Sequence, residues 1–421
     1  MEMVFSLIVN TAFVWVPVLA GTIFWHYWME WRQGMYLSNQ KWTLLEISIP
    51  KDIHKSPEAM EIIFNTLNDP SGVGTHWKKY WVGAVPHEFS LEIISVEGSI
   101  YFFIRTQTKF KELIKNQIYS QYPAAEVNEV DDYTRYVGDY AEHEGSWKLF
   151  GLEFILTNDD AFPIKTYVDY GLDKAVGTLE EEQKIDPITP QLEFLGSLRK
   201  NEQVWLQMII RSDKWSSWRK DAVQKIGELM GRPKKPQPKG NRQAVSDEIG
   251  FMFSGKHPDA KGESPEVSMY KVTHGEQEQM KAIERSLSKP GFEVGFRALY
   301  LARDGAFRPS NIAGMIGSVR QYNSANLNGF RPGPKTDFDY KYQDMSGNRL
   351  TSLKKKFFNN YVQRAFFNGA ELDRAEKEKT PFVLTSEELA TMFRFPGRVS
   401  TTATLERIEA TKSEAPTNLP I

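Results

Sequence analysis

The chain has 421 residues, more than one typical domain, so two or three structural units are expected. Its 52 basic and 54 acidic residues leave a net charge of −2, which excludes a general electrostatic attraction to nucleic acid. The absence of cysteine excludes disulfides, iron–sulfur clusters and thiolate zinc sites.

An apolar segment opens the chain, and residues 3–29 contain no Asp, Glu, Lys or Arg. About 20 such residues in a helix suffice to cross a bilayer, so residues 1–31 are predicted to be a transmembrane anchor. A signal peptide fits this segment less well, because no basic residue precedes the apolar run. A buried core helix also fits less well, because core helices are seldom uncharged on every face. The predicted anchor residues are Phe5, Leu7, Ile8, Phe13, Trp15, Leu19, Ile23, Phe24, Trp25 and Trp28.

The basic residues nearest to this segment give its predicted orientation. Arg32 and Lys41 follow it, and no Lys or Arg precedes it. The positive-inside bias then places the N-terminus outside and the body of the chain in the cytoplasm. The predicted location is therefore the bacterial inner membrane, crossed once.

Residues 42–131 are predicted to form a first α/β unit. Alternating apolar residues indicate strands, and Ser56 and Thr108 are suited to begin the helices that follow the first and third strands. The order strand, helix, strand, strand, helix, strand is that of a split β-α-β, ferredoxin-like unit. The predicted strands cover residues 42–49, 89–96, 100–105 and 125–130.

Residues 147–331 show a weaker form of this pattern and are predicted to be a second ferredoxin-like unit. A polar, Pro/Gly/Lys-rich insert at residues 231–266 interrupts it. The predicted fold class is therefore α+β, with an N-terminal transmembrane helix, two ferredoxin-like units and an extended C-terminal tail. The unit has predicted strands at 147–157, 204–211 and 292–302, helices at 190–198, 215–230, 277–288 and 310–322, and a loop at 323–341.

Residues 348–421 are predicted to be a helical and extended C-terminal segment. Residues 350–367 mix basic and aromatic side chains and indicate a helix. Thr385 and Glu388 have the spacing of a capping box, which predicts a short helix over residues 386–393. Pro396 and the following glycine end that helix.

A phosphate-binding loop is suggested at residues 250–257 (GFMFSGKH), whose spacing matches that motif as far as Lys256. His257 stands where Ser or Thr would hold magnesium, and Pro258 follows where a helix should begin, so a loop with chance glycines is the preferred interpretation. The histidines form no metal-binding spacing, and neither a nucleophile elbow nor an acid–base pair can be assigned. The sequence therefore predicts no catalytic residue, no cofactor, no metal and no enzyme activity.

Nucleic-acid contacts are considered for Lys354, Lys355, Lys356 and Arg364, which lie among aromatic residues. Such mixtures can contact phosphates and stack on bases. Because the net charge is near zero, an amphipathic helix whose aromatic residues face a core is the preferred interpretation.

The segment FVLTSEELATMFRFP, at residues 382–396, resembles a segment of membrane-tethered proteins related to conjugation and type IV secretion ATPases of the FtsK–HerA class. The tail at residues 405–420 is similar to the stretch that leads into the ATPase domain of that bacterial family. The sequence departs from the family's pattern at two places. Arg394 stands where the family often has His, and the sequence stops at Ile421, where the family continues into a nucleotide-binding domain. The residues that carry the resemblance are Leu384, Thr385, Glu387, Glu388, Leu389, Ala390, Phe393 and Pro396.

The resemblance implies a membrane-anchored, non-catalytic platform or adaptor for a translocating ATPase of a conjugation- or secretion-like system. That ATPase would be a separate polypeptide, or the sequence would be a fragment of a longer ATPase. The alternative function is a membrane-tethered single-stranded nucleic-acid-binding protein. The expected partners are membrane lipid and an FtsK–HerA-class ATPase, while nucleic acid and self-association are left open.

Overall fold

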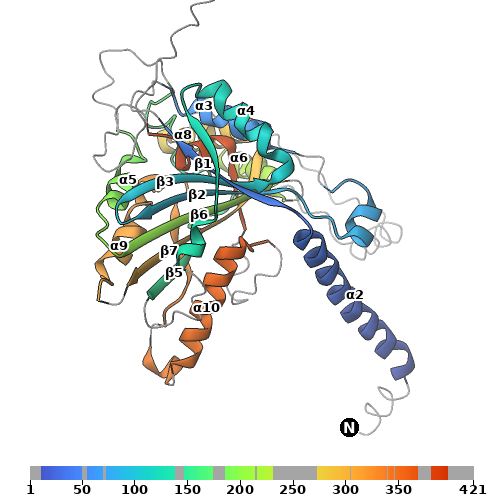
Figure 1. Ribbon diagram of the computed structural model, residues 1–421. Coiled ribbons are helices and arrows are strands. Elements are labelled where there is room, and N and C mark those ends of the chain that lie inside the picture. Colours follow the sequence, from blue (N-terminus) through green and yellow to red (C-terminus); the bar gives the residue numbers. More distant parts are fainter. Residues whose placement is uncertain are drawn as a thin grey trace, which may run out of the picture.

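The computed structural model describes residues 11–49, 55–69, 73–137, 147–173, 185–213, 216–230, 273–303, 305–338, 340–345, 347–367 and 381–396. These residues form an α+β fold built on one antiparallel sheet of nine strands (Figure 1). Eight of the described strands follow the order β4-β1-β3-β2-β6-β7-β5-β8, and β9 pairs with β7 beside this path.

The first half of the sheet has the strand order β4-β1-β3-β2, which places the first strand between the third and the fourth. β2 and β3 form a hairpin whose two turn residues, Glu97 and Gly98, have φ angles of 55° and 93°. Positive φ at both positions is what a two-residue hairpin turn requires. The elements are β1 (Trp42–Ser48), α3 (Glu58–Leu67), β2 (Glu88–Val96), β3 (Ser99–Gln107), α4 (Lys111–Gln121) and β4 (Glu126–Val130).

The second half has the mirrored order β6-β7-β5-β8, and β2 pairs with β6 to join the two halves. The two units predicted from the sequence therefore share one continuous sheet. The elements are β5 (Trp147–Leu156), α5 (Thr189–Gly196), β6 (Glu202–Ser212), α6 (Trp218–Leu229), α8 (His274–Leu287), β7 (Gly291–Arg303), α9 (Ser310–Gly317) and β8 (Phe330–Lys335).

β8 lies in the stretch predicted as loop, so that prediction was wrong. Its sequence, FRPGPK, contains two prolines, which cannot donate to a strand ladder. β8 pairs only with β5 at the rim of the sheet, where missing donors are tolerated.

Helices cover the two faces of the sheet unequally. One face packs its apolar side chains against α3, α4, α5 and α9, and α6 and α8 lie on the same side (Figure 1). The other face is covered by α10 (Asn348–Gln363), whose Phe357, Phe358 and Tyr361 are buried against the sheet. Gly151 of β5 permits this close packing, because a Cβ there would lie 2.3 Å from the Phe357 ring.

Two buried arginines fix the end of α10. Arg297 of β7 donates to the carbonyl oxygens of Asn360 at 2.9 Å and Ala365 at 3.1 Å. Arg364, in the left-handed conformation at the helix C-cap, pairs with the buried Glu92 through an Nε–Oε1 distance of 3.0 Å. Cationic groups at a helix C-terminus also offset its partial negative charge.

The helix α2 (Ala12–Ser38) corrects the prediction of a transmembrane anchor. Within the described part of the chain, no helix is long and apolar enough to cross a membrane. The second half of α2 carries His26, Glu30 and Arg32, and Trp25 packs against Tyr80 at a ring distance of 5.7 Å. The predicted single-pass inner-membrane location depended on this helix, so that prediction is wrong as well. The predicted placement of the body in the cytoplasm was derived from the same helix and loses its basis.

Short helical turns complete the described structure. The π-helical turn η1 contacts α2, and Arg32 donates to the carbonyl oxygen of Trp81 through its Nε at 2.7 Å. The turns are η1 (Lys78–Val82), η2 (Thr108–Phe110), η3 (Tyr133–Tyr136), η6 (Arg320–Tyr322) and η7 (Lys341–Asp344).

Some predictions fall outside the described residues. They concern Phe5, Leu7 and Ile8 of the proposed anchor, the insert at 231–266, the phosphate-loop-like residues 250–257 and the tail at 399–421.

Candidate functional site

The segment that carries the family resemblance forms the last described part of the chain, and every residue from 382 to 396 is buried. It consists of β9 (Phe382–Thr385), α11 (Ser386–Met392) and the residues up to Pro396. We call residues 382–396 the clasp segment. β9 pairs with β7 from Gly291↔Thr385 to Val294↔Phe382, beyond the part of β7 that pairs with β5.

A capping box begins α11, as the Thr385 and Glu388 spacing predicts. Glu388 Oε2 accepts hydrogen bonds from the backbone N–H and the hydroxyl of Thr385, both at 2.8 Å. Glu388 Oε1 accepts a bond from the backbone N–H of Ile164 at 2.8 Å. One buried carboxyl therefore starts the helix and also holds a distant stretch of chain.

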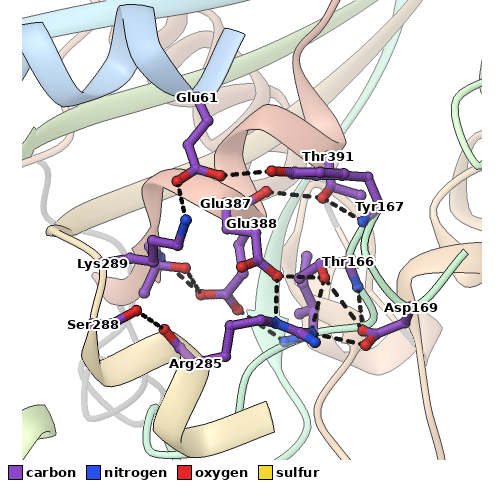
Figure 2. A network of polar contacts seen from close by, with 12 residues as sticks. Glu61, Thr166, Tyr167, Asp169, Arg285, Ser288, Lys289, Glu387, Glu388 and Thr391 are labelled. Atoms are coloured by element: carbon purple, nitrogen blue, oxygen red, sulfur yellow. Dashed lines mark hydrogen bonds and ion pairs between the residues drawn. The ribbon is translucent and has the colours of Figure 1, made fainter. Parts of the chain in front are cut away.

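Glu387 makes a second cross-link to the same stretch (Figure 2). Its Oε1 accepts from the Thr166 hydroxyl at 2.6 Å and lies 2.9 Å from Arg285 Nε of α8. Arg285 Nη2 also donates to Asp169 Oδ1 at 2.8 Å. Thr391 adds a third link, because its hydroxyl oxygen accepts from the backbone N–H of Tyr167 at 3.0 Å.

Glu61 extends the network to the first half of the sheet (Figure 2). This residue lies on α3 and is buried, with an exposed fraction of 3%. Its Oε2 accepts from the Tyr167 hydroxyl at 2.7 Å, and its Oε1 accepts from Lys289 Nζ at 2.5 Å. The network therefore joins α3 of the first half to α8 and residues 164–169 of the second.

Aromatic packing makes the same connection on the apolar side of the clasp segment. The Phe393 ring lies 6.5 Å from Phe64 of α3 and 6.0 Å from Phe102 of β3. The Phe395 ring lies 5.1 Å from Tyr122. The clasp segment is thus held by β7 of the second half and by α3, β3 and Tyr122 of the first half.

Burial controls the ionisation of the clasp carboxyls. It raises the pKa of Glu388 to about 7 and raises the pKa of Glu387 above its ordinary value. Glu387 Oε2 is buried and accepts no hydrogen bond, so no donor at this oxygen stabilises the ionised form of the carboxyl. These two groups favour the neutral form more than an exposed glutamate does.

A cavity of about 450 Å³ lies beside β9 and is lined in part by Asp159, Asp160, Trp218 and Asp221. Asp160 Oδ2 accepts from the backbone N–H of Val383 at 3.3 Å, and burial raises its pKa to about 6. Despite these carboxyls, the described residues contain no group of His, Asp and Glu arranged to hold a metal ion.

The structure places the other predicted site residues apart from the clasp segment. Lys354 and Lys355 of α10 are half-buried and Lys356 is exposed, whereas Arg364 is buried and paired with Glu92 and Asp132. Arg364 therefore does not share a surface with the three lysines. Among the anchor residues, Leu19, Ile23, Phe24 and Trp25 are exposed, Trp28 is half-buried, and Phe13 and Trp15 belong to α2.

Sequence reasoning missed the residues that receive the clasp segment. Glu61 lies between apolar residues on the buried side of an amphipathic helix, and that position was the one available signal for it. Thr166, Tyr167, Arg285 and Lys289 have no distinguishing local pattern. Their roles depend on contacts between residues more than a hundred positions apart in the chain.

Comparison of the sequence with protein-family models and with curated proteins finds no match. The resemblance of residues 382–396 to a segment of ATPase-associated proteins therefore stays a prediction.

Proposed function

We propose that this chain is a non-catalytic platform or adaptor for a translocating ATPase of a conjugation- or secretion-like system, with the ATPase on another polypeptide. The observation that carries the proposal is the clasp segment. It is the segment that resembles the ATPase-associated family, and it is built into the core across both halves of the sheet.

Such a platform must transmit load between its body and the moving ATPase without unfolding locally. The clasp segment combines strand pairing with β7, an ion pair between Glu387 and Arg285, and aromatic packing. Segments with many buried contacts lie at the high end of local stability. The clasp segment is therefore a firmly held part of the fold, as the proposed platform requires.

The proposal is tested by co-purification of the intact chain with FtsK–HerA-class ATPases from the same genome. We expect a complex that survives gel filtration with the wild-type chain. The Phe393→Ala chain, in which the clasp segment is loosened, should give less complex. Failure of every such ATPase to bind the wild-type chain contradicts the proposal.

A turnover assay tests the non-catalytic part separately. We expect the purified chain to leave ATP intact. ATP hydrolysis that is lost in Lys256→Ala would show that residues 250–257 act as a phosphate-binding loop, and would overturn this part of the proposal.

A further inference from the structure

A second cavity, of about 330 Å³, lies where the two halves of the sheet meet. It is enclosed by the end of α3, the start of β2, the start of α4 and the end of β6. Its volume falls at the lower end of the range for small-molecule pockets. None of its lining residues belongs to the clasp segment, so this site is separate from the proposed platform function.

Five of the ten residues that line this cavity are apolar, and three of the ten are aromatic. Leu67 and Phe89 are buried, and the Phe110 ring lies 5.8 Å from the Phe89 ring. The His87 ring meets the Phe110 ring edge to face at 4.8 Å. Flat ring faces of this kind suit a planar ligand, because aromatic pairs gain from stacked and edge-to-face contact.

Two polar atoms in this wall lack hydrogen-bond partners. Asn68 Oδ1 and His87 Nδ1 are both buried, and neither has a partner. Buried polar atoms in folded proteins nearly always have one, so each of these two atoms has an unused hydrogen-bonding position beside the cavity. A third polar group is Ser212, whose Oγ accepts from the backbone N–H of Asp69 at 2.7 Å and so keeps its own proton to donate.

The charge around the cavity is balanced. Burial, and next the nearby Lys109, lower the pKa of His87, so its ring is neutral at neutral pH. Asp69 and Lys109 have opposite charges and both act on His87. The Lys109 ammonium lies 4.8 Å from the centre of the Phe110 ring. This arrangement gives neither an anion nor a cation a clear advantage.

We propose that this cavity binds a small, uncharged nitrogen heterocycle of nucleobase size. Its ring faces would lie against Phe89, Phe110 and Leu67. An N–H donor of the ligand would satisfy Asn68 Oδ1, and a ring nitrogen or N–H would pair with His87 Nδ1. The class follows from the aromatic lining residues, the two buried polar atoms without partners, and the opposite charges of Asp69 and Lys109 near the His87 ring.

The test uses the intact chain with adenine, cytosine and uracil as probes, in isothermal titration and in saturation-transfer NMR. At least one base should bind. His87→Phe keeps the aromatic packing and removes the nitrogens, and Asn68→Leu keeps the size and removes the amide. Each change removes one hydrogen bond, so we expect about tenfold weaker binding in each variant.

Three comparisons keep the result decisive. Leu113→Trp fills the cavity from a partly exposed position without altering either polar atom, and should abolish binding. Gln224→Leu, in the other cavity, should leave affinity unchanged. Toluene, which has the ring faces without the polar edge, should bind more weakly than the best base.

The proposal is overturned if none of the three bases binds the wild-type chain. It is equally overturned if toluene binds as tightly as the best base, or if His87→Phe and Asn68→Leu, both folded by circular dichroism, bind like wild type.

Discussion

Replacing Glu388 by Gln should change how the stability of the protein depends on pH. Burial raises the pKa of this carboxyl to about 7 from an ordinary value of 4.5. A group with a raised folded-state pKa stabilises the fold while it stays protonated, and that stabilisation is lost as the pH rises through the folded pKa. The ionisation of Glu388 should therefore make the free energy of unfolding of the wild-type protein fall as the pH rises from 4.5 to 7.

The magnitude follows from the two pKa values. One pKa unit corresponds to about 1.4 kcal/mol, so Glu388 should lower the free energy of unfolding by about 3 kcal/mol across this range. Gln cannot ionise, and it retains the shape of the protonated acid. The stability of Glu388→Gln relative to wild type should therefore rise by about 2.5 kcal/mol between pH 5 and pH 8, because a small part of the effect already appears below pH 5.

The assay is urea unfolding at pH 5, 6, 7 and 8, followed by tryptophan fluorescence. Other buried carboxyls titrate in both proteins, so the difference between the two proteins isolates Glu388 and its coupling to Glu387.

Glu276→Gln is a matched control. Glu276 belongs to the capping box of α8 with Thr273, but it is only half-buried, and its pKa is lowered by the hydrogen bonds from Thr273. Its stability contribution is lost as the pH falls through that lowered pKa, so Glu276→Gln should show no trend from pH 5 to 8. A constant difference between Glu388→Gln and wild type across this range would show that Glu388 does not titrate with a raised pKa in the folded protein.

Three further predictions concern packing and buried charge. Arg364→Met leaves Glu92 buried without its cation and should cost about 3–5 kcal/mol, measured by urea unfolding; recovery in the Glu92→Gln, Arg364→Met double variant is expected, and a neutral single variant would show that the pair is unimportant. Phe393→Ala removes a fully buried ring between Phe64 and Phe102 and should cost about 3–5 kcal/mol in the same assay; a loss below 1 kcal/mol would mean that the clasp segment contributes little. Gly151→Ala places a Cβ 2.3 Å from the Phe357 ring and should cost about 1–3 kcal/mol while loosening α10, seen as faster amide exchange in that helix; unchanged exchange would contradict the close approach.

Local patterns in the sequence predicted local structure well. The capping box of Thr385 and Glu388 predicted a helix over residues 386–393, and α11 covers Ser386–Met392. The predicted strands from residue 42 to residue 130 are all present, with ends shifted by one or two residues. These features depend on neighbouring residues, whose spacing the sequence displays directly.

Contacts across the chain could not be predicted in the same way. The second oxygen of Glu388 bonds to Ile164, and no local pattern links two residues so far apart. The pairing of β2 with β6 likewise joins two predicted units whose sequences give no sign of a shared edge. β9 pairs with residues 291–294 of β7, a part of β7 that is available because its pairing with β5 ends at Phe296.

Two errors have clear physical causes. The apolar N-terminal run suggested a spanning helix, but the described helix continues into residues that include Glu30 and Arg32. Arg364 is close in sequence to the three lysines, which suggests a shared nucleic-acid contact. Closeness in sequence does not show which way a side chain points. The left-handed backbone of Arg364, at φ 56°, ends the helix, and its side chain points to Glu92 inside the fold.

We propose above that this chain supports an ATPase carried by another polypeptide. The most direct measurement is the ATP hydrolysis rate of a co-purified FtsK–HerA-class ATPase, alone, with the wild-type chain and with the Phe393→Ala chain. We expect no turnover by the chain itself. We also expect the wild-type chain to change the rate of the ATPase, and the Phe393→Ala chain to change it less. Turnover by the chain alone, or an ATPase rate that the wild-type chain leaves unchanged, would contradict it.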